Sequence, residues 1–414
     1  MRRKILSKEP VLSDRERKNL LMLETIKNSG PISKTDISRL TQLNIVTVSN
    51  YITHFIKEGL VAERGLDISS GGRRPVLIEL NPGYGYVIGL DLGRHEPFPI
   101  KIKMVGILAD LSGNIIAKLI RTRHKERMDE MLGHAVDLVK DLVRKAGVKK
   151  EEIKGVGLGV SGVIDEPTGT VRCLLRDGDS GNYEFLMNRI EREFGFPAFI
   201  GNDATFAAYG EYSFRSETLM RNMLYMYSDV GCGFIVKGEI YCGATGCAGE
   251  LTMNLPRSQD SSIHCGSAVD CILKPRDIGW MLTQEAIGVL TEETNKESRI
   301  KGIAGKLEDI SFEVIIKAAE EGDKFSIELL RKGGELLGMK IAYLVNLFNP
   351  DMVIVGGSLE HAGAFILDPI KNVVSRWALP EAADAVKIVN SRLGGDAVAM
   401  GAASLVIREL FATL

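Results

Sequence analysis

The sequence predicts an α/β protein in which a two-lobed body, with a mixed sheet in each lobe, follows a small N-terminal module. Helical patterns and two strand-like runs occupy residues 1–82, and strand-like and helical segments then alternate to the end. With 414 residues, 45% of them hydrophobic, the chain is long enough for two or three cores. We expect domains at 1–82, at 83–204 together with a C-terminal helix over 396–414, and at 205–395.

Three helical patterns open the module. A first helix begins at Asp14 and ends before Gly30-Pro31. Ser33 can cap a second helix, which turns Leu40 inward, and Asn44 can cap a third. Two short helices joined by a tight turn predict a helix-turn-helix unit.

The third helix and the segment after it carry groups that suit DNA. Hydroxyl and amide side chains in the first turn of this helix can reach base edges in a major groove. The runs 61–64 and 76–80 alternate like the strands of a wing, and their loop holds glycines and adjacent arginines that suit a narrow minor groove. Candidate DNA contacts are Lys34, Thr47, Ser49, Asn50, Gly72, Arg73 and Arg74. The alternatives are a protein-binding module and a merely solvated arginine pair.

Charge is distributed unevenly along the chain. Residues 1–82 contain 14 Lys and Arg against 9 Asp and Glu, so they carry +5 in a chain whose formal net charge is −2. This basic excess predicts a salt-dependent affinity for DNA phosphates. No run approaches the ~18 apolar residues of a membrane span, and we therefore expect a cytoplasmic protein without membrane contact.

The body begins with a strand over 86–93, followed by a strand over 105–110 that turns through Ser112-Gly113-Asn114 into a third strand. A helix over 127–146 precedes the buried-strand pattern of 156–160. Further along, an amphipathic helix over 328–348 suits a core or an interface. Ligands of two-lobed α/β folds usually lie between the lobes.

Five motifs in the body resemble those of the ROK family, whose name stands for repressors, open reading frames and kinases. Their order and spacing carry the resemblance, which covers nearly the whole chain; they occupy 157–165, 201–204, 243–250, 344–357 and 393–403. Together with the winged helix, they are most similar to the DNA-binding branch of xylose- and N-acetylglucosamine-responsive repressors. The resemblance implies a two-lobed actin-like (ribonuclease-H-like) sugar-kinase fold for the body.

The resemblance also implies a sugar site. Gly162, Asn202, Asp203 and Glu250 match sugar-binding positions of the family, and Asp203 matches the base that accepts a proton from a sugar hydroxyl in its kinases. The same carboxylate and amide groups can hold a neutral sugar without any chemistry.

Both expected phosphate loops differ from those of the family's kinases. Asp91-Leu92-Gly93 stands where the kinases have Asp-x-Gly-Gly-Thr, and Tyr227-Ser228-Asp229 stands in place of Gly-Thr-Gly. An aspartate there repels a polyphosphate, and the backbone loses flexible glycines. A remaining nucleotide pocket for Mg-ATP would use Gly231, Gly233, Gly356 and Gly357, which otherwise suit tight strand ends.

The family's zinc site is matched only in part, because a methionine replaces its histidine and the cysteine knuckle lacks one cysteine. Zinc accepts mixed Cys/His ligand sets. The candidate ligands are His264, Cys265 and Cys271, with Cys242 or Cys247 as the fourth. Cysteines in a chain of this kind are otherwise structural free thiols.

These features predict a sugar-responsive transcriptional regulator, a repressor of carbohydrate genes, in which a sugar or sugar phosphate closes the lobes and shifts the winged helices. A homodimer or a dimer of dimers would place two winged helices about 34 Å apart on operator DNA, or a multiple of that distance. The alternative is an ATP-dependent kinase of the glucokinase or N-acetylglucosamine kinase type with Asp203 as its base. A scaffold whose winged helix contacts protein is a third hypothesis.

Overall fold

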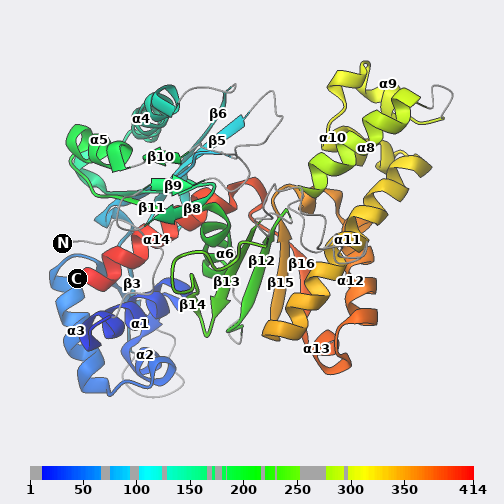
Figure 1. Ribbon diagram of the computed structural model, residues 1–414. Coiled ribbons are helices and arrows are strands. Elements are labelled where there is room, and N and C mark those ends of the chain that lie inside the picture. The colour runs from blue at the N-terminus through cyan, green and yellow to red at the C-terminus, as the bar shows by residue number, and fades with distance from the viewer. Residues whose placement is uncertain are drawn as a thin grey trace.

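The computed structural model describes residues 12–66, 75–93, 102–123, 128–165, 170–172, 180–182, 184–215, 220–228, 231–251, 277–292 and 297–414. Its elements form an N-terminal module and two lobes (Figure 1). Short 3₁₀ helices lie at Pro82–Tyr84, Lys150–Glu152, Leu307–Asp309, Leu359–Ala362 and Gly394–Asp396. No helix in this part of the chain is both long and apolar enough to cross a bilayer.

The N-terminal module contains three helices and a three-stranded antiparallel sheet in the order β1-β3-β2. Its elements are α1 (Asp14–Ser29), β1 (Ile32–Ser33), α2 (Lys34–Thr41), α3 (Ile45–Lys57), β2 (Val61–Leu66) and β3 (Val76–Leu80). Both predicted caps are confirmed: the Ser33 hydroxyl accepts a hydrogen bond from the Asp36 N–H at 3.1 Å, and the Asn44 side chain accepts one from the Val46 N–H at 2.8 Å. The inward position predicted for Leu40 is wrong, because in this eight-residue helix Ile37 and Thr41 fill the buried side and Leu40 is 55% exposed.

The first lobe contains a five-stranded mixed sheet in the order β11-β7-β4-β5-β6. Strands β4, β7 and β11 are parallel, whereas β5 is antiparallel to β4 and β6 is antiparallel to β5 at the edge of the sheet. Its elements are β4 (Tyr86–Asp91), β5 (Ile102–Asp110), β6 (Ile115–Arg123), α4 (Met128–Ala146), β7 (Ile153–Val160), α5 (Glu184–Phe194), β11 (Ala198–Asn202) and α6 (Asp203–Ser213), with a small antiparallel sheet of β8 (Val163–Asp165), β9 (Thr170–Arg172) and β10 (Ser180–Asn182).

The sheet of the second lobe repeats this topology. Its order is β14-β13-β12-β15-β16. Strands β12, β15 and β16 are parallel, whereas β13 is antiparallel to β12 and β14 is antiparallel to β13. The elements are β12 (Met223–Tyr227), β13 (Gly231–Val236), β14 (Glu239–Ile240), α8 (Ile278–Glu292), α9 (Ile300–Ala304), α10 (Phe312–Glu320), α11 (Lys324–Phe348), β15 (Met352–Gly356), α12 (Ala364–Trp377), α13 (Pro380–Ala385), β16 (Lys387–Asn390) and α14 (Ala397–Thr413). A mixed sheet in each of two lobes is the architecture that the sequence predicted for the body.

Each sheet is followed by a helix that packs on the sheet of the other lobe. α6 follows the first sheet and lies against β12 and β13, whereas α14 follows the second sheet and lies against β4 and β7. The two helices cross in contact because glycines let their backbones meet. A Cβ added at Gly210 would lie 2.6 Å from the Ala397 oxygen, and one at Gly401 would overlap the Phe206 carbonyl. Figure 1 shows α6 and α14 between the two sheets.

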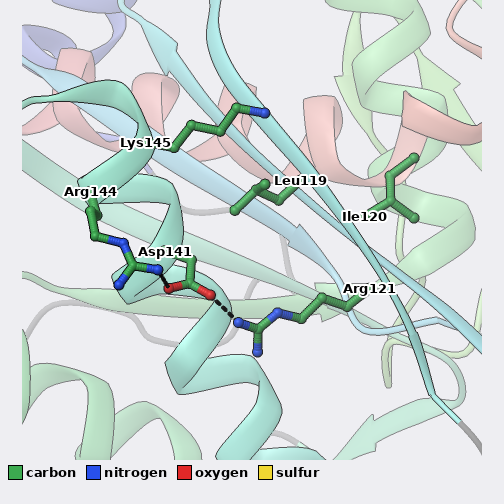
Figure 2. A pocket seen from close by; sticks show the side chains of 6 residues that line it. All are labelled: Leu119, Ile120, Arg121, Asp141, Arg144 and Lys145. Carbon is green, nitrogen blue, oxygen red and sulfur yellow. Dashed lines mark hydrogen bonds and ion pairs between the residues drawn. The ribbon is translucent and has the colours of Figure 1, made fainter.

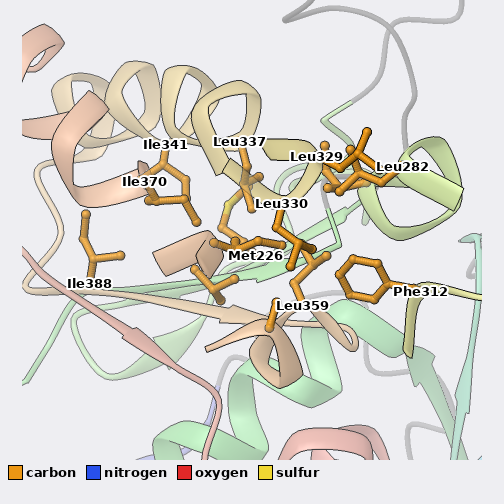
Figure 3. Packing of buried hydrophobic residues seen from close by; sticks show 14 of the residues in the cluster. Met226, Leu282, Phe312, Leu329, Leu330, Leu337, Ile341, Leu359, Ile370 and Ile388 are labelled. Atoms are coloured by element: carbon orange, nitrogen blue, oxygen red, sulfur yellow. The ribbon is translucent and has the colours of Figure 1, made fainter. Parts of the chain in front are cut away.

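The cores follow from this arrangement. In the second lobe, α11 buries the apolar face predicted for 328–348, including Leu329, Leu337, Ile341 and Leu344, against the sheet and α12 (Figure 3). In the N-terminal module, the buried residues of α1 and α3 form one continuous cluster with β5 and α14. The module therefore shares a hydrophobic core with the first lobe.

Candidate functional site

The predicted sugar-binding residues meet where β7 and β11 end. These strands are parallel neighbours, and Val160 pairs with Asn202, so the turn at Gly162 lies beside the start of α6. The Asn202 side chain joins the two segments: its Nδ2 donates to the Gly162 oxygen at 3.2 Å, and its Oδ1 accepts from the Thr205 N–H at 3.0 Å. Asn202 is thus the N-cap of α6 and also holds the Gly162 turn.

Asp203 occupies the first position of α6 and is 7% exposed. Its Oδ1 accepts a hydrogen bond from the Ala204 N–H at 2.8 Å. The first turn of a helix favours a carboxylate because the unsatisfied N–H groups there carry partial positive charge. Asp203 is therefore placed as a hydrogen-bond acceptor next to Asn202.

Glu250 reaches the same region from the second lobe. It forms an isolated antiparallel bridge with Gly231, and the preceding Gly249 accepts a hydrogen bond from the Cys232 N–H at 2.8 Å. A Cβ added at Gly231 would lie 3.2 Å from the Cβ of Ala204, so this bridge runs past the start of α6. The structure thus connects Gly162, Asn202 and Asp203 directly, and it connects Glu250 to them through Gly231.

At the four positions of the predicted nucleotide pocket, close packing or backbone conformation explains why the residue is glycine. A Cβ at Gly233 would overlap the Ala204 oxygen, and one at Gly356 would overlap the Tyr225 hydroxyl. Gly357 has a φ of 70°, which favours glycine. Gly231 and Gly356 lie on either side of Tyr227, across β13, β12 and β15. Close packing explains these glycines without a nucleotide, and a nucleotide pocket stays a prediction.

The two expected phosphate loops are described in part. Asp91 closes a turn at the end of β4, where its Oδ1 accepts a hydrogen bond from the Gly93 N–H at 2.8 Å; residues 94–101, which follow, lie outside the described residues. Ser228, after β12, is buried at a φ of 56°, and its hydroxyl donates to Asp277 at 3.1 Å. A residue with a side chain thus adopts a left-handed conformation here and is tied to the start of α8. The loss of a phosphate loop stays a prediction.

The predicted zinc ligands His264, Cys265 and Cys271 lie outside the described residues. Of the two proposed fourth ligands, Cys242 is buried in an apolar cluster between α6 and α14, whereas Cys247 is exposed. No group of three metal-ligating side chains occurs within the described part of the chain. Cys242 therefore fits the core better than a metal site, and zinc binding through Cys247 stays a prediction.

The candidate DNA-facing surface is the exposed side of α3. Val48, Ile52 and Phe55 are buried, and the opposite stripe carries Val46, Asn50, Thr53 and Lys57. Asn50 is exposed as predicted, whereas Thr47 and Ser49 are only half-exposed, as is Lys34 at the first position of α2. Gly72, Arg73 and Arg74 lie outside the described residues.

Sequence reasoning missed Val46, which is 63% exposed, and Thr53. The helical period could have found both residues, because they lie four before and three after Asn50.

A surface pocket between β6 and α4 lies apart from these residues. Figure 2 shows Arg121 and Arg144 both directed at Asp141, which forms ion pairs with each of them, the second at 2.6 Å. The Lys145 ammonium donates to the Lys118 oxygen at 2.9 Å. The charged groups that line this pocket are thus engaged with one another or with backbone, and none of the predicted site residues lines it.

Comparison with known proteins relates the whole chain to a family of regulators. The sequence model of the ROK family matches residues 87–409. A xylose repressor of Caldicellulosiruptor bescii is 31% identical over 94% of this chain and 95% of its own length. The transcriptional dual regulator NagC of Escherichia coli is 26% identical over 93% of this chain and 91% of its own.

Two solved structures cover different shares of the chain. A ROK family transcriptional regulator, described as a homologue of the Escherichia coli Mlc protein, superposes with a TM-score of 0.72 at 22% identity and covers 96% of this chain and 97% of its own. A ROK family glucokinase from Streptomyces griseus, in complex with glucose and AMPPNP, has a TM-score of 0.61 at 25% identity and covers 99% of its own chain but 78% of this one. About a fifth of the present chain therefore has no counterpart in the kinase.

Proposed function

This chain belongs to the ROK family, and on that premise we propose that it is a sugar-responsive transcriptional repressor whose N-terminal module binds operator DNA. One observation carries the proposal: proteins named as xylose and N-acetylglucosamine repressors match the chain over almost its full length, whereas the glucokinase covers 78% of it. The exposed stripe of α3 and the basic excess of residues 1–82 support the DNA-binding part.

The effector in this proposal is a sugar held at the start of α6. A sugar presents a ring of hydroxyl groups, and each of them can donate and accept a hydrogen bond. Asp203 and Glu250 supply acceptors, and the Asn202 amide supplies an acceptor and donors beside the Gly162 backbone. These groups recognise a sugar whether or not it is then phosphorylated.

We propose that no phosphoryl transfer follows. A kinase needs a backbone cradle for the polyphosphate in addition to the base that Asp203 would supply. Ser228, buried in a left-handed turn and bound to Asp277, stands where the family's kinases have a glycine-rich loop. Relatives that match more than 90% of the chain are named as a xylose repressor and an N-acetylglucosamine repressor, which supports a binding function for the body.

The proposed regulator acts in the cytoplasm as a homodimer or a dimer of dimers. One winged helix contacts only a short stretch of DNA. Two modules about 34 Å apart, or a multiple of that distance, can contact the two half-sites of a symmetric operator together and so bind it more tightly. Apolar residues exposed on α11 and α12, including Tyr343, Leu347 and Trp377, are available for contacts between subunits.

A thermal-shift screen tests the effector assignment. The purified protein is melted with xylose, glucose, N-acetylglucosamine and their phosphates, each with and without Mg-ATP, because a ligand of the native state raises the Tm. We expect one sugar to raise the Tm, with no further change on adding Mg-ATP. Stabilisation by Mg-ATP together with consumption of the sugar would replace the proposal with the kinase.

A further inference from the structure

The N-terminal module is docked on the two helices that cross between the lobes. α1 runs along the C-terminal part of α14, where the Arg15 guanidinium donates to the Leu414 oxygen at 2.7 Å and the Asn19 amide to the Ala412 oxygen at 3.5 Å. Leu23 and Ile26 of α1 belong to the same buried cluster as Phe411 of α14. A movement of α14 therefore has to move α1 or break a packed core.

The last turn of α1 also contacts the end of α6. The Lys27 ammonium lies 5.0 Å from the ring centre of Phe214, the C-cap residue of α6. The same ring packs against Gly113, where an added Cβ would overlap it. α6 is thus a continuous helix with Asp203 of the proposed sugar site at one end and the DNA-binding module at the other.

The second half of α6 is also fixed to the segment that leads into α14. Glu211, which is 1% exposed, pairs with Arg215 at 2.9 Å. Its other oxygen accepts hydrogen bonds from the Ser391 hydroxyl at 2.6 Å and from the N–H groups of Arg392 and Leu393 at 2.7 and 2.8 Å. These bonds join α6 to the start of α14, so we expect the two segments to move together.

Arg408 on α14 lies between carboxylates of two different bodies. It forms an ion pair with Glu239 on β14 of the second lobe, and its guanidinium lies 5.8 Å from the ring centre of Tyr209 on α6. Glu24 on α1 is a second carboxylate whose charge acts on Arg408. Burial raises the pKa of Glu24, while the charges of Arg408 and Lys27 and the Tyr209 hydroxyl oppose that rise.

We propose that Arg408 couples the sugar site to the DNA-binding module by exchanging its partner, from Glu239 of the second lobe to Glu24 of α1, when the lobes move. This inference rests on the proposed function and names its regulatory element. A sugar that closes the lobes displaces β14 relative to α14, because β14 belongs to the sheet of the second lobe whereas α14 packs on β4 and β7 of the first. The partly buried Arg408 then loses one carboxylate and pairs with Glu24, whose charge already acts on it, and this pairing ties α1 to the new arrangement.

The test measures the ratio of the DNA dissociation constants with and without sugar. The probes are a duplex selected from a random-sequence library by the wild-type protein, and the sugars xylose, glucose and N-acetylglucosamine. We expect the wild-type ratio to be about 5-fold or more and the Glu24→Gln and Arg408→Met ratios to fall below about 2-fold. Lys18→Met is the matched control, because Lys18 pairs with Asp14 on the same helix α1 outside the junction, and its ratio should equal that of the wild type.

Two further variants guard against a simple folding defect. Tyr209→Phe removes only the hydroxyl that acts on Glu24, and it should therefore also lower the ratio of the two DNA dissociation constants. Glu239→Gln should shift sugar-free DNA affinity in the direction opposite to Glu24→Gln, because each variant removes a different partner of Arg408. Either of two results would overturn this inference and leave the proposed function standing. The first is a wild-type ratio in both Glu24→Gln and Tyr209→Phe. The second is a shift of sugar-free DNA affinity in the same direction in Glu24→Gln and Glu239→Gln. A wild-type protein whose DNA binding ignores every sugar would instead contradict the proposed function.

Discussion

At the scale of single residues, Glu360 is held in surroundings that oppose its charge. Its side chain is 6% exposed, and neither carboxylate oxygen has a hydrogen-bond partner of good geometry in the described part of the chain. Burial raises the pKa of Glu360. The folded protein therefore binds a proton at this carboxylate more readily than the unfolded chain does.

The Glu360 environment predicts a pH-dependent stability. Because its folded pKa is raised, the stability it contributes is fully present below the unfolded value and is lost as the pH rises through the folded value. Glu360→Gln should therefore raise the free energy of unfolding by about 1–3 kcal/mol at pH 8, and by less at pH 4. Denaturant unfolding at both pH values measures this, with the exposed Glu381→Gln as control. An equal effect of Glu360→Gln at both pH values would contradict it.

Asn202 has two tasks that substitutions can separate. Serine caps a helix about as well as asparagine, whereas alanine loses about 1 kcal/mol. Asn202→Ser should therefore keep the Tm while it lowers sugar affinity, because its shorter side chain cannot reach the Gly162 oxygen. Asn202→Ala should lower both, and thermal melting with titrated sugar distinguishes the two. Unchanged sugar affinity in both variants would remove Asn202 from the site.

At the scale of elements, the crossing of α6 and α14 depends on glycines. Gly401→Ala would push a methyl group into the Phe206 carbonyl, a backbone group that cannot rotate away. We expect it to destabilise the protein by about 1–3 kcal/mol. The control is Gly288→Ala in α8, where a Cβ meets nothing within 4 Å and helix propensity predicts a gain of up to about 1 kcal/mol. Equal stabilities of the two variants would show that the helices can separate at little cost.

The exposed stripe of α3 predicts where DNA recognition is lost. Asn50 lies at the centre of the stripe, and an amide that reads a base edge contributes about 1–3 kcal/mol. Asn50→Ala should weaken binding to the selected duplex by about that amount, with little change for random DNA. Fluorescence anisotropy measures both, and Asn372→Ala on the exposed face of α12 serves as control. An equal loss on both duplexes would assign Asn50 a backbone contact instead.

Features of the fold that depend on residues nearby in the sequence could be predicted, whereas features that depend on distant residues could not. The caps at Ser33 and Asn44 were predictable, because each one acts on an N–H within three residues. The side chain of Leu40 was not, because its exposure depends on how a short helix is oriented on its neighbours. The two-residue strand β1 pairs with β3 some 45 residues later, and no local pattern marks it.

The candidate site shows the same division. The motif around Asn202 and Asp203 was visible in the sequence, but the bridge between Glu250 and Gly231 is a tertiary pairing. The junction of Glu24, Tyr209 and Arg408 joins residues from the two ends of the chain and its middle. Such contacts follow from the exchange of α6 and α14 between lobes, which only the assembled fold reveals.

At the scale of the whole molecule, two sheets of the same topology are joined by exchanged helices, and the N-terminal module is packed on those helices. A ligand that changes the angle between the lobes must therefore act on α6 and α14, and through them on α1. Differential affinity of the sugar for the two lobe arrangements is the only thermodynamic source of that effect. This architecture suits a sensor, because the proposed sugar site and the proposed DNA-binding module are joined by the same helices.

The central claim is that a sugar bound at the start of α6 controls DNA binding by the N-terminal module. The most direct measurement is the dissociation constant for the selected duplex, followed by fluorescence anisotropy while the sugar that stabilises the protein is titrated. The account predicts that this constant rises by about 5-fold or more and saturates at the concentration at which the sugar site fills. A dissociation constant that stays unchanged while the sugar saturates its site would contradict it.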